Sequence, residues 1–227
     1  MIDNITGKDY RRYTAVFIDL DGTITESGEG CMNAVRYMFD KVGYEENDEA
    51  RIRSFVGPPI KKHLISAFGF SEEHAAQTYA YYREYYLDKG IHESRLYDGI
   101  EETLRGIKAS GKALYIATSK PEVMAMPILD MYGLLPLFDA VFGARHEEGI
   151  YDKTQVLQYG ISRLGKAPAN AVMVGDRSHD IIGGRAVGLD TIGVLYGYGD
   201  RKELLEARPD FIIDSVTDLS DMLGDTK

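Results

Sequence analysis

Two acidic residues stand one residue apart at the end of an apolar run, in the stretch FIDLDGT at positions 17–23. A carboxylate is costly within a buried strand unless it has a partner, because burial removes the water that stabilises its charge. Side chains two positions apart on an extended chain also point the same way, so Asp19 and Asp21 are expected to repel each other. The pair therefore predicts a site in which these carboxylates hold a positive group or take part in chemistry.

Further polar residues follow other apolar runs. Thr118 and Ser119 follow one such run, Lys153 precedes a predicted helix, and Asp176 lies in VGDRSHD directly after another run. If these runs are parallel strands, their carboxyl ends meet at one edge of the sheet, where ligands bind in open α/β folds. Asp180 lies near a helix start after Ser178, so a helix cap and a site residue are equally good interpretations of it.

The apolar runs themselves predict the fold class. They are short, continuous, separated by helical patterns, and span residues 14–19, 112–118, 139–143, 171–175 and 191–195, with a further edge strand at 211–214. Continuous apolar strands that alternate with helices are typical of a parallel sheet covered on both faces. We therefore expect an α/β protein with a Rossmann-like, doubly wound parallel sheet.

Two of the connecting helices have readable signals at their ends. Asp152 is a good cap for a helix that Gly165 would end, and Pro121 suits the first turn of the helix after the second strand. Pro127 is a misfit in that second helix, because an interior proline costs about 3 kcal/mol. We expect the helix to kink or restart there.

The first two strands are separated by more than a crossover needs. Residues 26–92 read as helices near 28–42, 47–55, 60–68 and 71–89, the last beginning at Ser71 and ending at Gly90. The sequence therefore predicts two domains: an α/β core made of residues 1–25 and 93–227, and an inserted helical cap made of residues 26–92.

Composition excludes several classes of partner. The 227-residue chain has a formal net charge of −10 and a pI near 5.0, which argues against nucleic-acid polymers and anionic membranes. Cys31 is the single cysteine, so it cannot form an internal disulfide, which fits a reducing compartment. No apolar run approaches the roughly 20 residues of a membrane span. We expect a soluble, cytoplasmic protein, and the sequence does not determine its oligomeric state.

The segments DLDGT, ATSK, Lys153 and GDRSHD together resemble the four motifs of the haloacid dehalogenase-like hydrolases, in the family's order. The helical insertion after the first motif resembles the cap of that superfamily. FVGPPI, ATSKPEV, VMVGDRSHDIIG and GVLYGYG resemble the branch of phosphoglycolate phosphatases and 5'-nucleotidases. The second motif departs from many relatives in having Ser119 where they have Asn, and the third lacks their Lys-Pro.

The resemblance implies a Mg²⁺-dependent phosphatase of small phosphomonoesters. Asp19 would attack phosphorus to form an aspartyl-phosphate, and Asp21 would protonate the leaving oxygen and then activate water. Thr118 would bind a phosphoryl oxygen and Lys153 would supply positive charge. The implied Mg²⁺ ligands are Asp19, the backbone carbonyl of Asp21, and Asp176. Asp180 would hold a metal-bound water or orient Lys153.

A wider set would contact the substrate: Gly22, Thr118, Ser119, Lys120, Gly57 and Pro58. Lys120 could share or take the role of Lys153, which we favour because Lys120 is expected to open a helix and Lys166 to lie in a helix–strand turn. The stiff loop Gly57-Pro58-Pro59 is as well explained by a plain helix–helix turn as by a contact with the leaving group.

Two alternatives remain open. A sugar phosphomutase would share both aspartates, and an interaction protein on the same scaffold would be expected to lack part of the catalytic set. The five histidines show no zinc-ligand spacing, although His179 is close to the metal motif. The tyrosines between Tyr79 and Tyr86 are better explained by packing than by stacking on bases.

Overall fold

The computed structural model describes residues 1–165 and 168–224. Lys166, expected in a helix–strand turn, lies outside these residues. Contacts divide the chain into two compact units, residues 1–24 with 96–227 and residues 25–95. The chain passes between them at a two-stranded sheet formed by β3 (Thr25–Glu26) and β4 (Arg95–Leu96).

The larger unit is built on a seven-stranded sheet of order β1-β9-β8-β7-β2-β5-β6. Every pairing is parallel except that of β1 with β9. The strands are β1 (Ile2–Asn4), β2 (Ala15–Ile18), β5 (Ala113–Pro121), β6 (Ala140–Ala144), β7 (Ala171–Gly175), β8 (Asp190–Val194) and β9 (Phe211–Ile213). This is the α/β fold with a parallel sheet that the sequence predicts.

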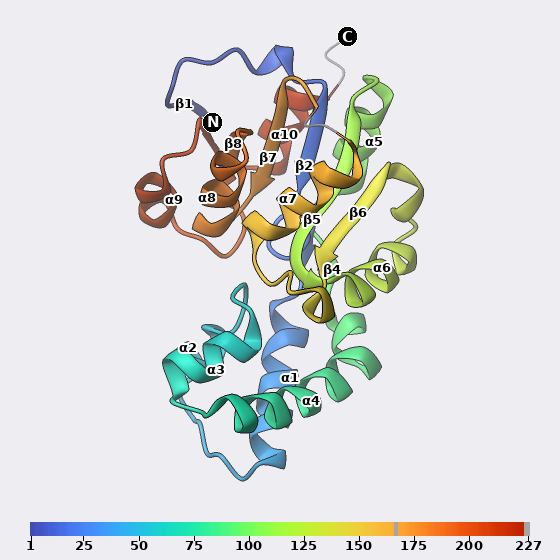
Figure 1. Cartoon of the computed structure of the whole chain (residues 1–227). Helices are drawn as coiled ribbons and strands as arrows, with labels where there is room; N and C mark the ends of the chain where they lie inside the picture. The colour runs from blue at the N-terminus through green and yellow to red at the C-terminus, as the bar shows by residue number, and fades with distance from the viewer. Residues whose placement is uncertain (166–167, 225–227) are drawn as a thin grey trace. The chain divides into compact units, whose positions relative to one another are not determined.

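Helices cover both faces of this sheet. They are α5 (Ile100–Ala109), α6 (Glu122–Met131), α7 (Lys153–Arg163), α8 (Ser178–Ala186), α9 (Arg201–Ala207) and α10 (Val216–Leu223). Figure 1 shows α7 and α8 in front of the sheet, with α5 and α10 behind it. The central strand β2 is buried along its whole length, which explains why it is continuously apolar.

The register of β2 decides where the site lies. Ile18, its last residue, pairs with Ile116 of β5 on one side and with Val174 of β7 on the other. The chain runs outward from β2 through β5 and β6, then returns to β7 and runs outward through β8 and β9. The residues at the carboxyl ends of β2, β5 and β7 therefore meet at the point where the strand order reverses.

Three local features differ from expectation: the position of the edge strand, the restart at Pro127 and the place of Pro121. The 211–214 run is not an edge strand, because Ile2–Asn4 pairs beyond it and takes the edge. α6 continues through Pro127 without a restart. Pro127 is exposed and so is Val123 four residues earlier, so the carbonyl that loses its partner can reach water. Pro121 ends β5 and caps α6 instead of lying in its first turn.

The smaller unit is helical: α1 (Gly28–Lys41), α2 (Glu49–Arg53), α3 (Ile60–Phe68) and α4 (Glu72–Asp88). Its core is aromatic, with Phe39 packed against Phe55 and Phe68 at ring separations of 5.7 and 5.5 Å. Tyr82 and Tyr86 of α4 are buried and stacked, as a packing role requires.

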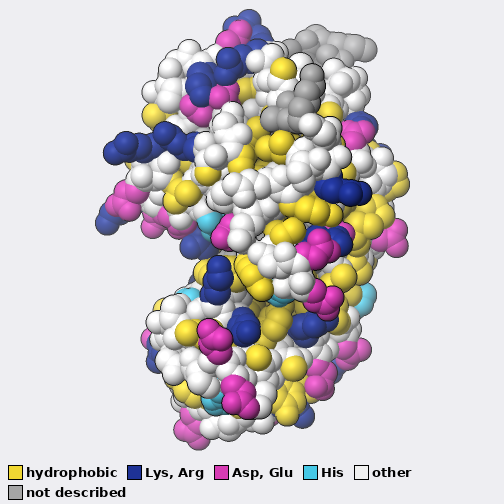
Figure 2. Space-filling view, viewed as in Figure 1, with side chains coloured by type: hydrophobic (Ala, Val, Ile, Leu, Met, Phe, Trp, Pro, Cys, Tyr) yellow, Lys and Arg dark blue, Asp and Glu magenta, His cyan; other side chains and the backbone are white. Residues whose placement is uncertain are grey.

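Figure 2 shows acidic and basic side chains interspersed over the face drawn, without a continuous basic surface among its described residues. In the described part of the chain, no helix combines the length and the apolar character needed to span a bilayer.

Candidate active site

Asp19 begins the site at the carboxyl end of β2. Its backbone N–H donates to the carbonyl of Val174 at 2.9 Å, which continues the ladder between β2 and β7. Its Oδ1 accepts from the N–H of Leu20 at 2.8 Å and lies 2.8 Å from Nζ of Lys153. Only 4% of Asp19 is exposed, so the carboxylate is fixed by the sheet and by one cation.

Lys153 is the first residue of α7, where Asp152 and Gln155 form a capping box that fixes the helix start. Its Nζ lies 2.8 Å from Asp19 Oδ1 and 2.7 Å from Asp180 Oδ1, and it donates to the carbonyl of Ala117 at 2.6 Å. The ammonium is buried, which by itself would lower its pKa. The two carboxylates outweigh burial and raise the pKa of Lys153, so it stays charged.

The same arrangement shifts the pKa values of Asp19 and Asp180 in opposite directions. Burial raises the pKa of Asp19 above its ordinary value, although Lys153 opposes this. Burial acts on Asp180 as well, but there Lys153 prevails and holds the pKa of that carboxyl below its ordinary value. The sequence could not show that one lysine serves both carboxylates.

Asp21 has a cation of its own. Its Oδ2 lies 2.9 Å from Nζ of Lys120, while its Oδ1 is buried without a hydrogen-bond partner among the described residues. The sequence predicts that Lys120 opens a helix, and this is wrong: Lys120 lies in an irregular end of β5. The register between Ala117 and Pro121 shifts, and such a bulge turns side chains away from the regular alternation.

Thr118 and Ser119 lie in this irregular segment too. Thr118 is 1% exposed, and its Oγ1 accepts from the N–H of Lys120 at 3.2 Å. Ser119 is half-buried. The irregular end of β5 thus brings a hydroxyl and a cation to the edge where Asp19 and Asp21 lie.

Asp176 follows β7 at this edge and is fully buried. Its Oδ2 accepts from the N–H of Tyr198 at 2.7 Å, whereas Oδ1 has no hydrogen-bond partner among the described residues. Burial, Asp180 and Asp19 raise its pKa well above the ordinary value. Gly22 packs directly on it: a Cβ there would lie 2.2 Å from Asp176 Oδ2, and Gly22 has a φ of +83°. Only glycine suits that position.

These carboxylates fit a divalent cation. The unpartnered Oδ1 atoms of Asp21 and Asp176 are buried hard oxygen donors, the ligand type that Mg²⁺ prefers. A buried carboxylate that lacks a cation is costly, and Asp176 has no ion pair with Lys or Arg in the described part of the chain. Ligand atoms of Asp19, His179 and Asp180 also lie within 4.8 Å of one another.

Asp180 makes a contact at the start of a helix and a contact within the site. Its Oδ2 accepts from the N–H of Arg177 at 3.0 Å at the start of α8, and its Oδ1 faces Lys153. His179, which is close to the metal motif in the sequence, has its Nε2 3.8 Å from Asp180 Oδ1. Gly57 and Pro58 belong to the helical unit, where Gly57 has a φ of +106° and Pro59 caps α3.

Sequence reasoning did not identify Tyr198 or Glu203 as site residues, yet both contact the segment after β7. Glu203 Oε1 accepts from the N–H of Ser178 at 2.8 Å and from Nε of Arg177 at 2.9 Å. Tyr198 lies in the GVLYGYG segment, but it acts through a backbone N–H that its residue type does not reveal, and Glu203 lies on an ordinary surface helix.

The fold and the site define a Rossmann-like α/β enzyme with a cluster of carboxylates and two lysines at the switch point of its sheet. Residues 16–194 match the family described as haloacid dehalogenase-like hydrolase. The chain belongs to this family, as its four motifs predict, and it is accordingly an enzyme.

Similar proteins carry several functional names. A 5'-nucleotidase of Pseudomonas aeruginosa is 35% identical over 198 residues, which are 87% of this chain and 90% of that protein. The tyrosine-protein kinase PtkA of Mycobacterium tuberculosis is also 35% identical, over 184 residues that are 81% of this chain and 62% of that protein. Proteins named phosphoglycolate phosphatase match as well.

Among solved structures, one described as a predicted phosphatase from Clostridium acetobutylicum has a TM-score of 0.88 and 38% identity. The match covers 92% of this chain and 97% of that chain.

Proposed function

We propose that the protein is a Mg²⁺-dependent phosphatase that hydrolyses small phosphomonoesters, of the phosphoglycolate or nucleoside 5'-monophosphate type, through an aspartyl-phosphate. The observation that carries the proposal is the position of Asp19. It is a buried carboxylate held by Lys153 at 2.8 Å, beside an acid whose Oδ1 has no hydrogen-bond partner among the described residues. The relatives named 5'-nucleotidase and phosphoglycolate phosphatase support the substrate class.

In the proposed reaction, a carboxylate oxygen of Asp19 forms a bond to phosphorus as the ester P–O bond breaks. Asp21 gives its proton to the leaving alkoxide oxygen. It then takes a proton from the water that attacks the acyl phosphate, and inorganic phosphate leaves while Asp19 is regenerated. Asp21 suits both directions of proton transfer because 19% of its side chain is exposed, whereas Asp180 is fully buried.

The two lysines have separate tasks. Lys153 lies on Asp19 and can compensate charge on the phosphoryl group as it transfers. Lys120 lies 2.9 Å from Asp21 and can offset the negative charge near it during the reaction. The hydroxyl of Thr118, two residues before Lys120, would donate a hydrogen bond to a phosphoryl oxygen.

The proposed metal ligands are Asp19, the carbonyl of Asp21, and Asp176, with Asp180 orienting Lys153. When bound, Mg²⁺ supplies positive charge that offsets repulsion between these acids and the anionic substrate. The cytoplasm remains the proposed compartment, and Cys31, which is buried and not in a disulfide, is compatible with it.

Phosphate release from a panel of small esters tests the proposal. Phosphoglycolate, nucleoside monophosphates and an aryl phosphate should release inorganic phosphate with Mg²⁺ and should not after chelation by EDTA. Asp19→Asn should lower kcat more than about 100-fold, because it removes the attacking charge with little change of shape. Asp130→Asn, an exposed residue of α6, is the matched control. A variant at Asp19 that kept more than a hundredth of kcat would refute the covalent role.

Two rival activities have distinct outcomes in the same assay. A phosphomutase would need a bisphosphate activator and would return a phosphorylated sugar in place of free phosphate. A kinase, the activity in the name of one relative, would move the γ-phosphate of ATP to a tyrosine hydroxyl. Phosphate release without either transfer product supports the phosphatase.

A further inference from the structure

A segment outside the four motifs contacts both loops that carry the proposed metal ligands. It comprises residues 196–203, which run from the loop after β8 into the first turn of α9. One of these loops follows β2 and contains Asp21 and Gly22, and the other follows β7 and contains Asp176. We call residues 196–203 the strut segment.

The strut segment fixes one oxygen of Asp176 and leaves the other open. Its Tyr198 N–H donates to Asp176 Oδ2 at 2.7 Å, and no hydrogen bond of the described residues engages Oδ1. An N–H from the backbone cannot rotate away as a side chain can, so it sets the orientation of the carboxylate plane.

The same segment contacts the loop after β2. The hydroxyl of Tyr196 donates a hydrogen bond to the carbonyl oxygen of Thr23 at 3.2 Å. The ring of Tyr196 packs edge-on against Tyr97 with a centroid separation of 5.1 Å. A Cβ at Gly197 would lie 2.3 Å from the carbonyl oxygen of Gly22 and 2.4 Å from Cβ of Asp176. Gly197 therefore lies between the two loops at a separation that admits no side chain.

The end of the strut segment holds the Asp176 loop from the other side. Glu203 accepts from the N–H of Ser178 at 2.8 Å and from Nε of Arg177 at 2.9 Å. Arg177 and Ser178 immediately follow Asp176, so this anchor limits the movement of the loop that carries it.

We infer that the strut segment, through Gly197, the N–H of Tyr198, and Glu203, positions Asp176 for divalent-cation binding. This inference rests on the proposed function for its choice of cation. These residues are positioning residues, since they touch Asp176 and its loop and not the reacting atoms. Neighbours that orient metal ligands typically contribute about 10- to 100-fold in metal affinity.

Two variants with matched controls test the inference. Glu203→Ala removes the anchor, and Glu206→Ala on the same helix changes an exposed glutamate. Gly197→Ala inserts a methyl group between the loops, where φ is not in the positive region. Gly106→Ala is its control, because a Cβ there meets nothing nearer than 3.9 Å.

The measurement is the Kd for Mg²⁺ of the full chain, by calorimetry without substrate, after circular dichroism confirms folding. We expect Kd to rise about 10- to 100-fold in both variants and to stay within twofold in both controls. Lost phosphate release should be largely recovered at saturating Mg²⁺, which a general loss of structure would not allow. If Gly197→Ala does not fold, Glu203→Ala decides alone.

The outcomes separate this inference from the proposed function. Variants that fold and bind Mg²⁺ as tightly as the unmodified chain would overturn the positioning role even if the protein is a phosphatase. A loss of Mg²⁺ affinity in a protein that hydrolyses none of the esters would support the positioning role while refuting the function. An unmodified chain that binds no Mg²⁺ would overturn the inference.

Discussion

At the scale of residues, the site is organised by two lysines that divide the carboxylates between them. Lys153 lies between Asp19 and Asp180, whereas Lys120 lies on Asp21. The two lysines differ in environment, because Lys153 and its two partners are almost completely buried, whereas 8% of the Lys120 side chain and 19% of the Asp21 side chain are exposed. Removing a cation from a buried pair costs far more than removing one from a hydrated pair.

We therefore predict unequal effects on stability. Lys153→Met leaves two buried carboxylates without their cation and should lower the free energy of unfolding by about 3–5 kcal/mol. Lys120→Met leaves one carboxylate whose side chain is 19% exposed, so it should lower the free energy of unfolding by less than Lys153→Met does. Urea unfolding followed by circular dichroism measures both. Equal losses would mean that Lys153 is not the structural partner of both acids.

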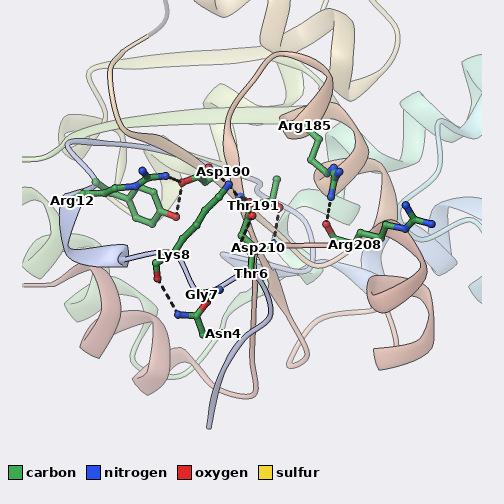
Figure 3. A network of polar contacts seen from close by, with 11 residues as sticks. Asn4, Thr6, Gly7, Lys8, Arg12, Arg185, Asp190, Thr191, Arg208 and Asp210 are labelled. Carbon is green, nitrogen blue, oxygen red and sulfur yellow. Dashed lines mark hydrogen bonds and ion pairs between the residues drawn. The ribbon is translucent and has the colours of Figure 1, made fainter.

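At the scale of elements, a second polar network lies at the amino ends of the strands. Figure 3 shows the segment after β1 tied to Asp190 at the start of β8 and to Asp210 just before β9. Lys8 forms ion pairs with both acids, and Arg12 forms one with Asp190. This network holds residues 5–13 against the sheet. It explains how β1, which has only three residues and little apolar character, stays paired with β9 as an edge strand.

Asp210 is the residue of this network whose loss should matter most. It is 6% exposed and accepts from the N–H of Thr191 at 2.9 Å and from the hydroxyl of Thr6 at 3.0 Å. Asp210→Ala leaves a buried N–H and the Lys8 ammonium without this partner, so unfolding should become about 3 kcal/mol easier. Because the candidate active site is at the carboxyl ends of the strands and this network is at their amino ends, kcat should be unchanged below the unfolding temperature.

Thermal and urea unfolding, together with phosphate release, check this prediction. Asp221→Ala is the control, since Asp221 is exposed on α10. A large fall in kcat for a folded Asp210→Ala protein would show that the two edges are coupled.

At the scale of the whole molecule, the helical unit is inserted directly after the Asp19 motif, and its proposed task is to select substrates. Gly57-Pro58-Pro59 precedes α3, and proline fixes φ while removing an N–H donor. We predict that replacing Pro58 and Pro59 with Gly changes the ranking of small esters in kcat/KM and leaves the Mg²⁺ requirement unchanged. Folded phosphoproteins should be poor substrates, because a cap in the proposed role would exclude them.

A panel of esters and one folded phosphoprotein, assayed with both forms of the protein, provides the measurement. The same ranking before and after the replacement would return the loop to a plain helix–helix turn. Efficient release of phosphate from the phosphoprotein would contradict the proposed role of the helical unit in selecting substrates.

The sequence by itself determined the parallel sheet and the family, and it singled out acids that the structure places at the ends of β2 and β7, because these features depend on local patterns. Apolar runs predict strands wherever burial is continuous, and acids at their ends stand out against them. The helix start at Asp152 was readable for the same reason, since a cap acts within a few residues. The continuous helix through Pro127 was missed, because the exposure that makes it tolerable is not visible in the sequence.

Only the tertiary structure decided which groups meet. Asp19 and Lys153 are 134 positions apart in the chain, yet their charged atoms lie 2.8 Å apart because β2 pairs with β7 and α7 precedes that strand. Lys120 reaches Asp21 through a bulge that propensity does not predict, and Tyr198 acts through a backbone N–H that every non-proline residue possesses. Register and backbone contacts of this kind arise from packing across the whole sheet, so no local stretch of sequence encodes them.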